Sequence, residues 1–113
     1  MEVIKNILTA AGVQYRRGRF TSPPAGTYAV YFDDVSADGA DPVSPDTPGG
    51  LPRIYYHDAR VELYEPKPDD AAEAAIEAEL DAQGIAWTKE DRYWLQDVQR
   101  YQVLYDFSFT TKK

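Results

Sequence analysis

Large apolar side chains alternate near the end of this 113-residue chain. Every second residue from 101 to 109 is aromatic or aliphatic: Tyr101, Val103, Tyr105, Phe107 and Phe109. Side chains two residues apart lie on the same face of a β-strand, so the spacing predicts a strand with one buried face. We therefore expect the last element of the sequence to complete the core.

The segment just before this strand also fits a helical spacing. Six residues fall three or four positions apart, namely Trp94, Leu95, Val98, Tyr101, Gln102 and Tyr105. The strict alternation that follows favours the strand. A preceding strand over 85–93 is predicted to pair with it as a hairpin.

Two helices are predicted from apolar residues spaced three and four apart, over about 2–11 and 70–83. A glycine follows each helix, as is common at helix ends. At the start of the second helix, Asp70 and Glu73 are spaced like a capping box. Both helices are expected to pack on a sheet.

The rest of the sequence supplies the other strands and one long loop. Strand character is clear at 28–32 and 54–64 and weaker at 13–20. A stretch rich in Gly, Pro, Asp and Ser, at about 36–52, is predicted to be a long loop within a strand hairpin. We expect an α+β fold in a single domain over 1–113, with two helices and a mostly antiparallel sheet of four to five strands.

The charge balance is acidic, with 19 Asp and Glu against 12 Lys and Arg and a net charge of −7. This argues against broad binding of nucleic-acid phosphates. No apolar run is long enough for a membrane span and no signal-peptide pattern is present, so we expect no membrane partner and a cytoplasmic site of synthesis. The absence of cysteine fits a reducing compartment and excludes thiol catalysis.

Catalytic residues are scarce. The only histidine is His57, and a triad using the adjacent Asp58 would lack a Gly-x-Ser-x-Gly turn to present a serine. The acids between Asp33 and Asp46 do not have the spacing of a calcium loop, and 47–50 lacks the lysine of a phosphate loop. We expect no enzyme activity, no metal and no cofactor.

Two charge patterns are candidates for a subunit interface. Acids recur every fourth residue along the second predicted helix and form an acidic ridge, while three arginines near 13–20 form an arginine patch. The ridge is either a solvated face or the partner of the patch on a neighbouring subunit, in head-to-tail association. The candidate interface residues are Arg16, Arg17, Arg19, Asp69, Glu73, Glu77 and Asp81.

The long loop is a candidate interaction arm. It exceeds the roughly 12–15 residues at which loops without secondary structure become uncommon. Its prolines disfavour strand pairing and its acids keep it soluble, so we expect it to order only against a partner. The candidate contact residues are Asp38, Asp41, Val43, Asp46 and Leu51.

The C-terminal segment resembles a family of small phage proteins. The residues that carry the resemblance are Trp94-Leu95, Asp97, Tyr101-Gln102 and Tyr105-Asp106-Phe107. Together with the element order, they are similar to the tail terminators of tailed bacteriophages and prophages, also called tail completion or tail-to-head joining proteins. The section from Pro42 to Pro52 looks like an insertion relative to that pattern.

The resemblance implies a non-enzymatic virion protein, assembled in the cytoplasm of a bacterial host. Such proteins form a ring, hexameric in this expectation, that caps the tail tube and joins it to the head. The implied partners are other copies of the chain, the major tail tube protein and a head connector, while DNA passes through without specific binding. The alternatives are a head-completion or connector protein of the phage neck, or a small host protein-binding module with an aromatic surface formed by Tyr55, Tyr56, Tyr64 and Trp87.

Overall fold

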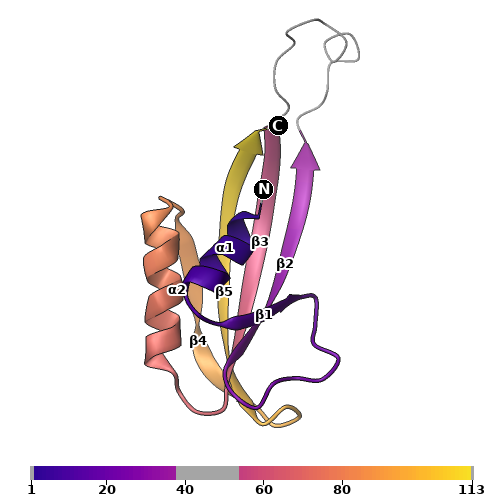
Figure 1. Ribbon diagram of the computed structural model, residues 1–113, viewed down its shortest axis with the longest axis vertical. Coiled ribbons are helices and arrows are strands. Elements are labelled where there is room, and N and C mark those ends of the chain that lie inside the picture. Colours follow the sequence, from indigo (N-terminus) through magenta and orange to yellow (C-terminus); the bar gives the residue numbers. More distant parts are fainter. Residues whose placement is uncertain (1, 38–53, 113) are drawn as a thin grey trace, which may run out of the picture.

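The computed structural model describes residues 2–37 and 54–112, which form one five-stranded sheet and two helices (Figure 1). The strand order in the sheet is β1-β2-β3-β5-β4. The elements along the chain are α1 (Val3–Ala10), β1 (Gln14–Arg17), β2 (Tyr28–Ala37), β3 (Ile54–Glu65), α2 (Asp70–Ala82), β4 (Trp87–Leu95) and β5 (Arg100–Lys112). The predicted α+β class, with a mostly antiparallel sheet, is confirmed.

The last strand, β5, lies between β3 and β4 and pairs with both in antiparallel fashion. Its alternating residues Val103, Tyr105 and Phe107 are all buried, as the spacing predicts. The helical alternative for this region is wrong, because β4 continues to Leu95 and a four-residue turn leads into β5 at Arg100.

Both helices pack on one face of the sheet, which we call the covered face. The core cluster joins Ile7 and Leu8 of α1, Ile76 and Leu80 of α2, and odd-numbered residues of the strands such as Leu63. In Figure 1, α1 crosses in front of β3 and β5, while α2 lies beside β4. Each fully buried Leu or Ile stabilises the fold by roughly 1.5–3 kcal/mol, so this layer supplies most of the folding energy.

The opposite side of the sheet, which we call the open face, has no helix over it in the described part of the chain. Its side chains are the even-numbered residues of β2, β3 and β5, aligned in rows by the strand register. One row joins Tyr28, Tyr64 and Gln102, and the next joins Val30, Glu62 and Leu104. The open face is therefore mixed in character, whereas the covered face is mainly apolar.

Several boundaries differ from the sequence-based expectation: β1 covers Gln14–Arg17 instead of 13–20, and β4 covers Trp87–Leu95 instead of 85–93. The strand predicted over 28–32 continues to Ala37, because its backbone pairs with β3 as far as the Ala37–Tyr55 partners, although most of the added side chains are exposed. The cap of α2 is Asp69 and not Asp70, since the Asp69 side chain accepts a hydrogen bond from the Ala72 amide at 3.1 Å.

Candidate functional site

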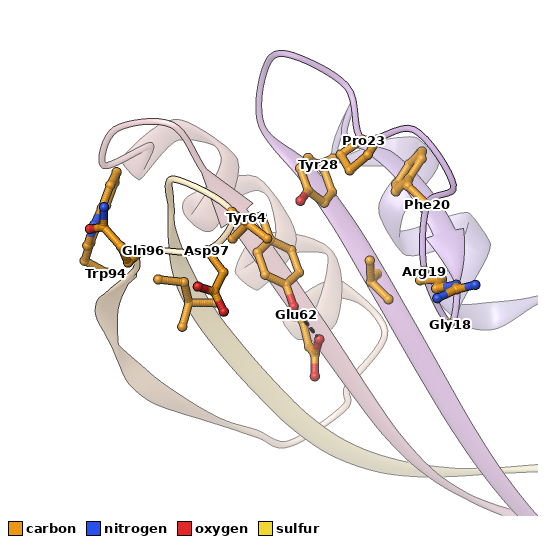
Figure 2. Close-up of a pocket in the computed structure, with 13 residues that line it drawn as sticks. Gly18, Arg19, Phe20, Pro23, Tyr28, Glu62, Tyr64, Trp94, Gln96 and Asp97 are labelled. Carbon is orange, nitrogen blue, oxygen red and sulfur yellow. Dashed lines mark hydrogen bonds between the residues drawn. The ribbon is translucent and has the colours of Figure 1, made fainter.

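A groove of about 540 Å³ lies on the open face near the β4–β5 turn (Figure 2). Its floor contains Tyr28, Val30, Glu62 and Tyr64 of the two neighbouring strands β2 and β3. The segment 18–23 forms one wall and the turn region 94–98 forms the other. This volume lies within the range of sites that hold small ligands or single side chains of a partner.

A chain of hydrogen bonds fixes the floor of the groove. The Tyr64 hydroxyl donates to Glu62 Oε1 at 2.7 Å and accepts from Gln102 Nε2 at 3.0 Å, while Tyr93 donates to Gln102 Oε1 at 2.6 Å. The ring of Tyr64 stacks on Tyr28 with centroids 5.1 Å apart. Burial, helped by the hydrogen bond to Glu62, raises the pKa of the Tyr64 hydroxyl, so Tyr64 stays a donor. The Glu62 carboxylate is thereby held in place.

Arg100 connects the segments that continue from the two walls. Its guanidinium donates to the carbonyl oxygens of Ala25 at 2.9 Å and Gln99 at 3.0 Å, and lies 6.0 Å from the centre of the Tyr28 ring. Gln99 closes the turn with a left-handed backbone (φ 54°), which is uncommon for a residue other than glycine. The groove is thus built from parts far apart in sequence that a single arginine holds together.

The lining of the groove carries two carboxylates and one guanidinium. Glu62 and Asp97 both line it, and in the described ranges neither forms an ion pair with a basic side chain. Arg19 also belongs to the lining, but Figure 2 shows its guanidinium directed away from the two carboxylates. This arrangement suits binding of a cationic group rather than covalent chemistry.

His57 lies elsewhere, on the covered face near the far end of the sheet. Its Nδ1 is 3.0 Å from both carboxylate oxygens of Asp33, its Nε2 is 2.9 Å from Thr111 Oγ1, and its ring stacks on Phe109 at 4.4 Å. Asp58, the sequence neighbour considered for a triad, points to the open face and accepts a hydrogen bond from Ser108. The observed cluster ties together β2, β3 and β5.

Every acid of the predicted ridge has a partner within the chain. Asp69 accepts from Thr27 Oγ1 at 2.6 Å as well as capping α2, and Asp81 accepts from Trp87 Nε1 at 2.9 Å. Glu77 accepts from Lys89 Nζ and from the Tyr105 hydroxyl, both at 2.7 Å. The ridge therefore attaches α2 to the sheet, whatever else it contacts.

Glu73, the remaining residue of the ridge, belongs to a cluster of charges that the sequence did not reveal. It binds Lys89 at 2.8 Å and Arg92 at 2.6 Å, and Arg92 also binds Asp70 at 2.9 Å and the fully buried Glu65 at 3.2 Å. We call Glu65, Asp70, Glu73, Lys89 and Arg92 the charge cluster. It contains three acids and two bases, so one acid lacks a matching base.

The two buried acids of the charge cluster have pKa values shifted in opposite directions. Burial, together with the neighbouring Glu73 carboxyl, raises the pKa of Glu65 to about 8. Burial opposes ionisation of Glu73 as well, but hydrogen bonds from Glu65, Lys89 and Arg92 outweigh it and lower the pKa of Glu73 to about 2. The pair holds one proton at neutral pH.

The arginine patch lies at the other side of the sheet from α2. Arg16 and Arg17 are exposed on the edge strand β1, with Arg17 donating to the Asp33 carbonyl at 3.3 Å and Arg16 lying 5.8 Å from the Phe20 ring. The structure does not bring the patch and the ridge together within one chain, so a contact between two subunits stays a prediction. The predicted loop contacts, Asp38, Asp41, Val43, Asp46 and Leu51, lie outside the described residues.

Three strand edges have no strand partner in the ranges 2–37 and 54–112, and one of them is the outer edge of β1. β1 pairs only with Tyr28–Tyr31, so the remainder of β2 to Ala37 has one open side, and β4 is open along its outer edge. Unpaired backbone groups of this kind are able to accept a strand from another chain. No described helix is long and apolar enough to cross a membrane.

Comparisons with known proteins give a likeness in fold. No family model matches the sequence, and no curated protein matches it. Among solved structures, the chain is similar to one from the "virion of native gene transfer agent (GTA) particle", with a TM-score of 0.56 and 16% sequence identity. The match covers 95% of this chain and 84% of that chain. The two share an architecture over nearly their full lengths.

Proposed function

We propose that this chain is a non-enzymatic structural protein of a phage-like particle. The observation that carries the proposal is the fold likeness to a chain of a gene transfer agent virion, which extends over 95% of the residues. The C-terminal motif supports the proposal independently, because it resembles the corresponding segment of phage tail terminators. The proposed location is the virion, after assembly in a bacterial host.

The specific role we propose is that of a tail terminator. Copies of the chain form a ring, hexameric in the proposal, that caps the tail tube and presents a surface to the head connector. The net charge of −7 suits a ring through which DNA passes without being held, since acidic surfaces repel phosphates. The partners are then other copies of the chain, the major tail tube protein and the connector.

Contacts between copies are supported by the free strand edges and by the placement of the charges. Arg16 and Arg17 of the arginine patch, on β1, and the helix α2 beside β4 lie at opposite edges of the sheet, as head-to-tail association requires. Glu73 and Glu77 already bind Lys89, so the exposed Asp81 is the ridge residue most available to a neighbour's arginine.

Native mass spectrometry of the protein, alone and mixed with purified tail tubes, tests the proposal. We expect rings in solution or on the tubes, and a chain that stays monomeric in both conditions would contradict it. Co-sedimentation with DNA-filled heads instead of tubes would favour a head-completion or connector role. Replacing Arg16 and Arg17 by Glu should abolish the ring, whereas the same charge change at the exposed Lys5 and Lys67 should not.

A further inference from the structure

We propose that the groove on the open face binds an arginine side chain of a partner protein. The groove combines an aromatic floor with two carboxylates, Glu62 and Asp97, that lack a basic partner among the described residues. The inference does not depend on the virion role, because it rests on the geometry of the groove alone.

The first reason is that the Glu62 carboxylate is fixed before any partner arrives. The Tyr64 hydroxyl donates to it at 2.7 Å, and Gln102, itself only 8% exposed, holds Tyr64 from the other side at 3.0 Å. A carboxylate in a fixed orientation loses little side-chain entropy on binding. Its second oxygen receives no hydrogen bond among the described residues, which leaves it open to a new donor.

The second reason is the shape and chemistry of the floor. The half-buried ring of Tyr64 lies at the base of the groove with the buried Tyr28 stacked behind it, and Glu62 and Asp97 line the same groove (Figure 2). A guanidinium is planar, stacks on aromatic rings and donates two parallel hydrogen bonds to a carboxylate. Lysine has the same charge but neither the planar surface nor the paired donors. The groove therefore favours arginine.

The third reason is that Arg100, which lies beside the groove, is already engaged by the backbone. Its guanidinium lies 6.0 Å from the centre of the Tyr28 ring and donates to the carbonyl oxygens of Pro24, Ala25 and Gln99. It cannot act as a counter-ion in the groove without breaking these hydrogen bonds. The negative charge in the groove is consequently left for a cation from outside.

Titration of the ¹⁵N-labelled protein with the peptide acetyl-Gly-Arg-Gly-amide tests the inference. The matched control is the same peptide with citrulline, which has the shape of arginine but no charge. We expect saturable shifts of the amide resonances of 96–98 and of the Trp94 indole, with the arginine peptide binding more tightly than a lysine peptide. Binding should weaken as the salt concentration rises.

Variants assign the binding to the two carboxylates. Glu62→Gln and Asp97→Asn should each weaken binding about threefold, and the double variant should abolish it. Glu90→Gln removes the same charge from an exposed site outside the groove and should leave the affinity unchanged. Thermal melting of each variant confirms that the fold is retained.

Three results would overturn the inference. Equal binding of the citrulline peptide would show that charge is not recognised, and unchanged affinity in the double variant would place the site elsewhere. Shifts at 96–98 that depend on protein concentration without any peptide would identify the occupant as a second copy of this chain in place of a different protein.

Discussion

The two faces of the sheet differ in how they handle charge. On the covered face, Glu65, Glu73 and Arg92 are buried or half-buried and bind one another beneath α2. On the open face, Glu62 and Asp97 sit at the surface of a groove with no basic partner in the described ranges. Charges that find partners within a chain stabilise its fold, whereas charges left without them are available for binding. The difference points to the open face as the one that meets other molecules.

The largest effect should come from removing the central base of the charge cluster. Arg92→Ala leaves buried carboxylates without their shared donor, and we expect the free energy of unfolding to fall by about 3 kcal/mol. Urea denaturation measures it. The matched control is Arg60→Ala, which breaks the half-exposed pair with Asp106 on the open face and should cost about 0.5 kcal/mol. Similar losses of unfolding free energy in the two variants would contradict the expected difference between the two faces.

The pH dependence of stability should be dominated by the covered face. Between about pH 2 and 8 the folded Glu65–Glu73 pair holds one proton, whereas in the unfolded chain both carboxyls titrate near 4.5. Above 4.5 the folded state thus binds more protons than the unfolded one, so stability falls as pH rises towards 8; below 4.5 the unfolded state binds more, and stability falls as pH drops. The contribution of the pair is largest near pH 4.5.

Raising the pH from 5 to 7 should lower the free energy of unfolding by about 2 kcal/mol through this pair. A difference of one bound proton gives at most about 1.4 kcal/mol per pH unit, and the expected loss approaches this limit. Glu65→Gln cannot ionise and should flatten the slope between pH 5 and 8. Glu62→Gln, on the open face, should leave the slope as it is. Chemical denaturation of the three proteins across this range measures the effect, and identical slopes would contradict the assignment to Glu65.

The smallest expected effect concerns the acidic ridge. Asp69→Ala removes the cap of α2 and the hydrogen bond from Thr27, and should lower the free energy of unfolding by about 1 kcal/mol. Asp69→Asn keeps the capping oxygen and should lose much less. If the alanine variant kept full stability but no longer formed rings, the ridge would have to be assigned to subunit contacts and not to the fold.

The elements of the fold could be predicted because each depends on local spacing. The alternation from Tyr101 to Phe109 and the helix patterns needed no knowledge of the rest of the chain. The extension of β2 to Ala37 was not predicted because its side chains, which include Asp33 and Asp34, show no apolar alternation. The backbone pairing with β3 keeps these residues in the strand.

The functional groups were harder to predict because they depend on contacts across the sheet. Arg92 meets Glu65 and Glu73 only once α2 has packed beside β4, and nothing in their sequence separation indicates that contact. The sequence offers Asp58 only as the chain neighbour of His57, in a triad that lacks a serine turn; adjacent strand residues point to opposite faces, and the observed partner of His57 is Asp33. The alternation of side chains along a strand is the signal in the sequence that Asp58 faces away from His57.

One extra residue in β4 decides which of its side chains lie on the covered face and which lie on the open face. The register with β5 shifts between Glu90 and Tyr93, so that Arg92 turns towards α2 and Tyr93 towards Gln102 on the open face. Without that residue, the side chains on one side of the shift would exchange faces. Arg92 would then point to solvent on the open face and Tyr93 would point into the core. Single-residue insertions and deletions between Glu90 and Tyr93 should therefore be far more harmful than changes of two residues, because only an even change restores both faces at once.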